Sequence, residues 1–401
     1  MNRFVPVLEK VIQFSLLTFA LSSLFSISIT QLSLAIGSLS WLLKTHLTRT
    51  WSEIRGTRVG IAILAFCLAY IFSLTTAVDL ESGINFIKKL VQVVIFFWVA
   101  NTVQDEKQRN LLVSLVIFAG VAAALNGIYS EIANPPVVVS EFGETIIRQV
   151  GTMSVPSTFA GLLMLTGLVT LGNFLFHEPK NHWLLGGIGI ISICLLIILA
   201  RQAWLGFLVG IIFLVYFWNK KFLGAIPLFL VFIFVLSPQV YKDRIESMTD
   251  IDNDQSLNIR KALWKGGWEI FKDHPITGCG FKCVDSVHTS YPDPTGFIAL
   301  NRGMHNNIMQ LLIDTGIVGF VAWLSIWVAY FIEIFKRWQV LAKDKTTGNN
   351  KGILLGSASA ILSFLVGGFF ESSFYDSEVV MLVYFIMGIS LAKVKNVPLR
   401  H

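Results

Sequence analysis

Long apolar stretches recur along the whole chain, and short polar segments separate them. The apolar runs are continuous and lack the alternation of half-buried strands, so they predict α-helices. A helix that crosses a bilayer needs about 20 mostly apolar residues. Twelve stretches approach this length: 5–22, 26–43, 59–76, 84–103, 110–130, 154–176, 183–200, 203–218, 222–238, 305–335, 353–371 and 375–393.

The composition points to the same class of protein. Hydrophobic residues make up 54% of the 401 residues, charged residues only 14%, and the mean hydropathy is +0.68. A soluble protein could not cover so much apolar surface, and an outer-membrane barrel would show alternating apolar and polar positions. We therefore predict an all-α integral membrane protein with about 12 transmembrane helices. The first apolar run, from Val5, has no obvious cleavage site and is expected to be a retained helix.

Lys and Arg are concentrated in alternate connecting segments, which orients the chain in a membrane. Cytoplasmic segments carry the excess of positive charge, and most Lys and Arg fall on that side if the N-terminus is cytoplasmic. Both termini are then cytoplasmic, and segments 131–153, 239–304 and 371–377 are extracytoplasmic. The exceptions in short extracytoplasmic segments are Lys88, Lys89, Arg148 and Arg201. The net charge of +6 follows this bias and does not indicate a nucleic-acid partner.

The longest polar segment divides the chain into three parts. Residues 1–238 hold the first nine predicted helices, residues 239–304 form a large ordered extracytoplasmic loop domain, and residues 305–401 hold the last three helices. Within the loop, apolar residues recur at helical spacing until Pro275, with Lys on the opposite side. This amphipathic helix suits a membrane surface, or it packs onto the loop's own core.

Four charged residues at the predicted membrane edge are candidates for function, because burying a charge in lipid costs about 2.5–3.5 kcal/mol on insertion scales. Arg201 lies in a tight turn between two apolar helices, and its planar fork of donors suits phosphate oxygens. Arg260 leads the loop helix, where the helix dipole gives a cation no benefit, so a bound anion explains it better. Arg148 is a further cation, and Glu371 can pair with an arginine or orient a histidine. The alternatives are snorkelling or solvated side chains.

His305 and Asn306 stand where the polar segment turns into a membrane span. Imidazole can exchange a proton near neutral pH. A polar stripe of Asn306, Gln310 and Asp314 follows at fourfold spacing, and Gly316 and Gly319 would let a neighbouring helix approach. The alternative is a helix cap or an interfacial histidine. Two arginines near a histidine are what a pyrophosphate site without metal or cofactor would need.

Other chemistries have weaker support. The histidines and aspartates of the loop do not have a recognised metal-ligand spacing, and the chain has no Walker-type loop that would indicate an ATP-driven pump. Cys279 and Cys283 lie four residues apart in a compartment that permits a disulfide, and their spacing leaves the pairing open.

The motif His305-Asn306-x9-Gly316-x-x-Gly319 resembles the signature of bacterial O-antigen ligases. The segment Leu199–Gly206 resembles the membrane-edge Arg segment of that family, and the stretch from Arg260 to Phe281 resembles the start of its large periplasmic loop. The order of the motifs and the position of the loop agree with the family as well.

The resemblance implies a GT-C glycosyltransferase of the bacterial inner membrane with its active site facing the periplasm. Such an enzyme transfers O-antigen polysaccharide from undecaprenyl pyrophosphate to a sugar hydroxyl of lipid A–core, without a metal and with inversion at the anomeric carbon. Carried over, Arg201 and Arg260 would hold the pyrophosphate, and His305 would be the base on the acceptor or would assist phosphate departure. Glu371 falls where the family has an acidic residue near the last loop, and Arg148, Asn306, Glu371 and Gln310 are expected to contact substrate.

Two groups of rival functions stay open. An O-antigen polymerase or a protein O-oligosaccharyltransferase would use the same donor, and the modest chain length favours a ligase over the protein-modifying relatives. A transporter or flippase would explain many helices. It would not explain an ordered loop with two Arg and Trp motifs, and few charges fall at mid-membrane depth.

Overall fold

The computed structural model describes most of the chain. The described ranges are 4–54, 57–133, 139–141, 144–146, 155–177, 180–236, 255–291, 293–343 and 348–392, with Met153, Gln239, Lys242 and Val394 singly.

The described chain is almost entirely helical. The first half holds α1 Val5–Ser22, α2 Ile27–Thr48, α3 Arg58–Ser73, α4 Leu80–Leu90, α5 Val94–Thr102, α6 Glu106–Ala133, α7 Pro156–Phe176 and α8 His182–Ile197. The second half holds α9 Arg201–Asn219, α10 Ala225–Leu236, α12 Gln255–Asp273, α13 Cys283–Val287, α14 Phe297–Asn301, α15 Asn307–Leu341, α16 Gly348–Gly367 and α17 Ser377–Leu391. Two three-residue strands, β1 Val139–Glu141 and β2 Glu144–Ile146, pair antiparallel.

Short 3-10 turns extend or join several of these helices. They are η1 Trp51–Glu53, η2 Leu74–Thr76, η3 Val91–Val93, η4 Lys220–Gly224, η5 His288–Ser290 and η6 Ser373–Tyr375.

Nine helical stretches of the described residues are long and apolar enough to cross a membrane. The sequence predicted about twelve, and helices do lie at the predicted places. The difference arises because α8 and α17 are shorter apolar helices, and because the stretches predicted at 203–218 and 222–238 are one candidate, Arg201–Val235, joined through η4. A multi-pass membrane protein follows from these helices.

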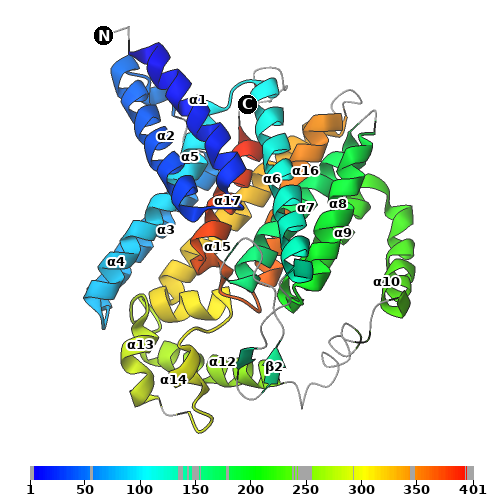
Figure 1. Ribbon diagram of the computed structural model, residues 1–401. Helices are drawn as coiled ribbons and strands as arrows, with labels where there is room; N and C mark the ends of the chain where they lie inside the picture. Colours follow the sequence, from blue (N-terminus) through cyan, green and yellow to red (C-terminus); the bar gives the residue numbers. More distant parts are fainter. Residues whose placement is uncertain are drawn as a thin grey trace.

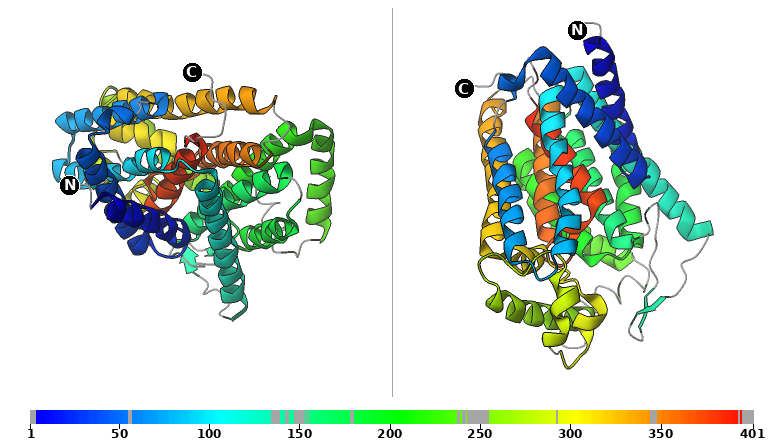
Figure 2. Two further views of the ribbon diagram at one scale, coloured as in Figure 1. Left: turned by 90° about the horizontal axis from the view of Figure 1, so that it is seen from above. Right: turned by 90° about the vertical axis from the view of Figure 1, so that its left-hand side faces the viewer.

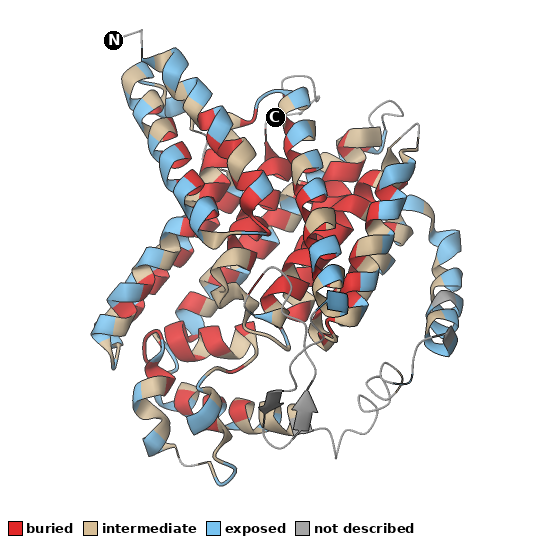
Figure 3. Ribbon diagram, viewed as in Figure 1, coloured by how far each residue is buried: buried red, intermediate tan, exposed pale blue. Residues whose placement is uncertain are grey.

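Three helices form the centre of the bundle. Helices α7, α16 and α17 carry the longest runs of buried residues, whereas α1, α2 and α10 show exposed faces (Figure 3). At the contact between α7 and α16 the backbones nearly touch, because a Cβ added to Gly172 would lie 2.5 Å from Cα of Gly356. Small residues permit such close packing of helices in membranes. The exposed large side chains outside, such as Phe14 and Leu32, suit contact with lipid.

The helices between residues 255 and 304 lie together at one end of the bundle. Figures 1 and 2 show α12, α13 and α14 at the end opposite to the start of α1 and the end of α17. They share a small core in which Leu263 and Ile270 of α12 pack with Ile298, Met304 and Ile313. The buried face of α12 therefore packs on this core, while Trp268 on its other face is 47% exposed.

Helix α15 is broken at Gly316, and the segment after α12 fills the break. Gly316 has a left-handed backbone (φ 62°) inside the helix. The N–H groups of Cys279 and Gly280 donate to the carbonyls of Ile313 and Asp314, 2.9 and 3.2 Å away. In return, the N–H groups of Ile317 and Val318 donate to the carbonyls of Pro275 and Ile276, 2.9 and 3.2 Å away.

This exchange gives Gly316 a different role from the one expected. A Cβ on Gly316 would lie 2.2 Å from the Ile276 carbonyl oxygen, so only glycine fits. The glycine admits the loop backbone, whereas the sequence interpretation assigned it to contact with a neighbouring helix. Every hydrogen bond named in the exchange replaces one that the break removes, as buried backbone groups require.

Candidate active site

His305 occupies a strained backbone position directly before α15. Its φ is 44°, in the left-handed region, which costs a residue with a Cβ about 1 kcal/mol or more. Asn306 is the N-cap of α15, and its side-chain oxygen accepts hydrogen bonds from the N–H groups of Ile308 and Met309. The predicted substrate contact of Asn306 thus competes with an ordinary cap, for which Asn is a preferred residue.

The His305 ring pairs with Glu371, 66 residues further along the chain. Nδ1 of His305 lies 3.1 Å from Oε1 of Glu371, and the same oxygen accepts the N–H of Ser372 at 3.0 Å. A carboxylate on Nδ1–H leaves Nε2 as the ring nitrogen that can take a proton. The His305 side chain is 38% exposed and that of Glu371 is 18% exposed, so the ring is accessible while the carboxylate stays largely covered.

The surroundings of Glu371 keep its carboxyl ionised. Burial by itself raises the pKa of this carboxyl, but the hydrogen bond and charge of His305, the N–H of Ser372 and the charge of Arg260 outweigh burial. The net pKa of Glu371 lies below its ordinary value. A negative charge is therefore held against the imidazole.

Helix α12 supports both halves of this pair. Nε of Arg260 donates to the carbonyl of Phe370 at 3.3 Å, and its Nη1 donates to the Ser256 side chain at 2.6 Å. One turn later, the indole N–H of Trp264 donates to the carbonyl of Met304 at 2.9 Å. Arg260 thus contacts the residue before Glu371, and Trp264 contacts the residue before His305. Three residues singled out from the sequence meet here.

Arg201 starts α9 at the same end of the bundle. The carbonyl of Gln202 lies 3.4 Å from the position that a Cβ on Gly367 would take. Gly367 ends α16, four residues before Glu371. The arginine turn and the Glu371 turn are therefore neighbours.

The remaining predicted site residues fall in different places. Arg148 lies outside the described residues. Gln310 is 7% exposed, its Oε1 accepts the Met304 N–H at 3.0 Å, and its Nε2 donates to Oδ1 of Asp314 at 3.1 Å. Both ends of this amide are engaged within the protein.

Several residues that hold the turn after α16 had not been predicted. Asn307 donates its N–H to the Gly368 carbonyl at 2.7 Å and accepts the Phe374 N–H at 2.9 Å. Lys89 donates to the Tyr375 carbonyl at 2.8 Å. The sequence signal that could have identified Lys89 is its position in a short segment on the predicted extracytoplasmic side, where Lys and Arg are otherwise rare.

Asp376 is also part of this turn and contacts α7. Thr158 donates to its carboxyl at 2.9 Å. Burial, together with the charge of Glu371, raises the pKa of Asp376 to about 6, despite the lowering effects of Thr158 and Lys89. The turn thus holds two acidic groups in contrasting environments.

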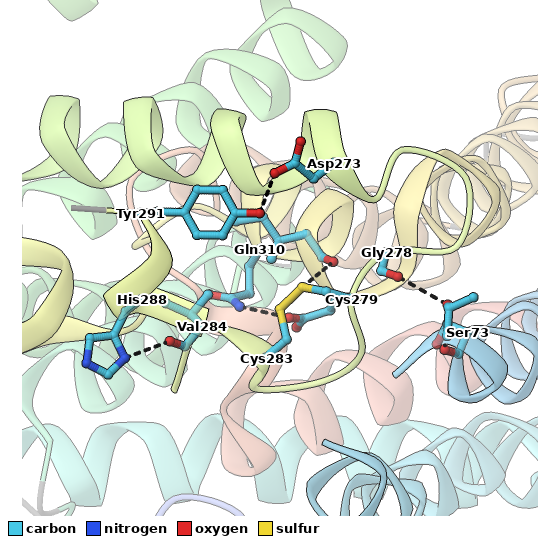
Figure 4. Close-up of a disulfide and its surroundings, with 12 residues drawn as sticks. Ser73, Asp273, Gly278, Cys279, Cys283, Val284, His288, Tyr291 and Gln310 are labelled. Carbon is cyan, nitrogen blue, oxygen red and sulfur yellow. Dashed lines mark hydrogen bonds between the residues drawn. A yellow bond between two sulfur atoms is a disulfide. The ribbon is translucent and has the colours of Figure 1, made fainter. Parts of the chain in front are cut away.

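Within the loop region, a disulfide joins Cys279 and Cys283, with their Cα atoms 5.7 Å apart (Figure 4). The two cysteines, whose pairing the sequence spacing left open, are therefore bonded to each other. Among the described residues no group of three or more His, Cys, Asp or Glu side chains is placed to hold a metal ion.

The family model described as O-Antigen ligase matches residues 186–324. The matched stretch includes Arg201, Arg260 and His305, whereas Glu371 lies beyond it. The match supports membership of that family, as the motifs indicated. No curated protein matches the chain.

Proposed function

We propose that this chain is a member of the O-antigen ligase family and transfers O-antigen polysaccharide from undecaprenyl pyrophosphate to lipid A–core. The transfer takes place at the periplasmic face of the bacterial inner membrane, with both chain termini in the cytoplasm. One observation supports the proposal most strongly: His305, Glu371 and Arg260 converge at one end of the bundle. His305 contacts Glu371 across 66 residues of sequence, and Arg260 contacts Phe370, next to Glu371, across 110 residues.

The proposed reaction is a single displacement. The oxygen of an acceptor hydroxyl forms a bond to the anomeric carbon, and the bond from that carbon to the pyrophosphate oxygen breaks. The electron pair of the broken bond stays on the pyrophosphate, whose charge Arg201 and Arg260 stabilise. The hydroxyl proton passes to Nε2 of His305. Attack from the face opposite the leaving group inverts the anomeric carbon.

Glu371 makes His305 a better base in this scheme. Its carboxylate keeps the proton on Nδ1, turns Nε2 outward and stabilises the imidazolium that forms. The second role for His305, proton donation to the departing phosphate, needs the ring already protonated. The rate of transfer rises with pH for the base role and falls with pH for the acid role, so a pH profile separates them.

The test is transfer by the purified protein in lipid nanodiscs with radiolabelled undecaprenyl-pyrophosphate-linked polysaccharide. Three acceptors are supplied in parallel: lipid A–core, a carrier-linked single repeat unit, and an acceptor protein. EDTA is added to every reaction, and ATP is omitted. We expect label on lipid A–core alone. Label on the repeat unit or the protein would assign the polymerase or oligosaccharyltransferase function, and a requirement for divalent metal would contradict the two-arginine mechanism.

A further inference from the structure

A buried chain of hydrogen bonds ends on the backbone next to His305. The Met304 N–H donates to Oε1 of Gln310, and Nε2 of Gln310 donates to Oδ1 of Asp314. Asp314 is fully buried and Gln310 nearly so. We propose that Gln310 and Asp314 are positioning residues that hold the His305 ring where it can reach the acceptor hydroxyl. This inference rests on the proposed function, in which His305 takes part in transfer.

Asp314 decides which way the Gln310 amide points. A carboxamide has a donor end and an acceptor end, so its two hydrogen-bond partners fix its orientation. Oδ1 of Asp314 accepts a hydrogen bond from the NH2 group of Gln310, which leaves the amide oxygen facing the Met304 N–H. A flipped amide would set two donors against each other.

His305 needs such support because its own backbone is strained. Its left-handed φ of 44° persists only if the neighbouring residues are held. Met304 is fixed through its N–H by Gln310 and through its carbonyl by Trp264. On the other side, the N–H of Asn306 donates to Oγ of Ser372 at 3.2 Å. Loss of the Gln310 contact releases one of these anchors.

Asp314 also links the two halves of the catalytic pair. Its carboxyl interacts with the side chain of Tyr375, which lies in the same turn as Glu371. Asp314 is thus connected to the backbone before His305 and to the turn that holds its partner carboxylate. Asp314 can therefore fix the distance and the angle between the His305 ring and the Glu371 carboxylate.

Steady-state kinetics distinguish positioning from substrate binding. Gln310→Met keeps the length of the side chain but removes both hydrogen bonds, and we expect kcat to fall about 10²-fold, with the KM values of donor and acceptor changed less than about twofold. Asp314→Leu should behave in the same way. Asp314→Asn keeps an oxygen for the Gln310 NH2 group and should retain kcat within about threefold. A raised KM with unchanged kcat in Gln310→Met would overturn the inference.

Hydrogen–deuterium exchange gives a second readout that does not depend on transfer. In wild-type protein the peptide containing Met304 to Asn306 should exchange slowly. Gln310→Met should speed this exchange at least tenfold, and Asp314→Asn should leave it unchanged. Equal exchange in wild type and Gln310→Met would refute the anchoring of Met304, even if the wild type proved inactive. An inactive wild type with the expected exchange pattern would instead count against the proposed function alone.

Discussion

Removal of the Glu371 charge should slow transfer without changing the shape of the site. In Glu371→Gln the amide oxygen can still face both Nδ1–H of His305 and the N–H of Ser372, because both donors point at one oxygen. The Ser372 contact opposes an amide flip, so the ring keeps its orientation. What the variant loses is the negative charge beside the imidazolium that forms during proton transfer.

The size of the effect follows from the 3.1 Å separation of the two groups. Coulomb's law gives ~5 kcal/mol at an effective dielectric constant of 20 and ~1 kcal/mol in bulk water. The His305 side chain is 38% exposed, so solvent screens the pair and a middle value applies. We expect a loss of ~2–3 kcal/mol, which is roughly a 30- to 150-fold fall in kcat.

The assay is kcat for transfer to lipid A–core in nanodiscs, with Glu378→Gln as the matched control. Glu378 is a partly exposed acid in the first turn of α17, outside the pair. Because the pKa of Glu371 is lowered, its charge is present above the ordinary value of about 4.3 and is lost as pH falls through the lower folded value. The wild-type carboxylate therefore stays ionised from pH 5 to 8, and a defect measured in this range reports the loss of its charge. A kcat within twofold of wild type, or a defect equal to that of the control, would show that the Glu371 charge does not assist transfer.

Three further substitutions test the contacts that hold the site in place. Gly316→Ala should destabilise the protein by about 1–3 kcal/mol and lower its thermal midpoint, whereas Gly189→Ala should not, because the space around Gly189 is open. Equal midpoints for the two variants would contradict the backbone exchange at Gly316. Asp376 has a raised folded pKa of about 6, so ionisation of its carboxyl should remove up to ~3 kcal/mol of stability as pH rises from about 4 to above 6. In Asp376→Asn the thermal midpoint should therefore change less with pH than in wild type. Parallel curves of midpoint against pH would contradict this role of Asp376. Arg260→Lys loses the guanidinium group that contacts the Phe370 carbonyl. We therefore expect kcat to fall about tenfold and the KM of the donor to rise. An unchanged donor KM would show that Arg260 does not bind the pyrophosphate.

The helices could be predicted from the sequence because the bilayer requires long apolar runs with internal hydrogen bonds. Local patterns also indicated α12 and its end before Pro275, and the helix does end at Asp273. Local patterns do not predict helix length at α8 and α17, where apolar runs long enough to cross a membrane form shorter helices.

The contacts of the candidate site depend on distant parts of the chain, and residue spacing does not encode them. Glu371 was one acid among several in its turn, and only the fold brings it to His305. The cap at Asn306 was foreseeable, since Asn is common at that position. The role of Gly316 was not, because its neighbour is a loop segment about 40 residues earlier and not the next helix.

The most direct test of the role of His305 is single-turnover transfer by His305→Ala, compared with His288→Ala. His288 lies in the same loop region, where its Nδ1 contacts the carbonyls of Val284 and Asp285. Both variants should bind the labelled donor as wild type does. We expect His305→Ala to lose transfer to lipid A–core and His288→Ala to retain it. Undiminished transfer by His305→Ala would show that this histidine takes no part in the reaction.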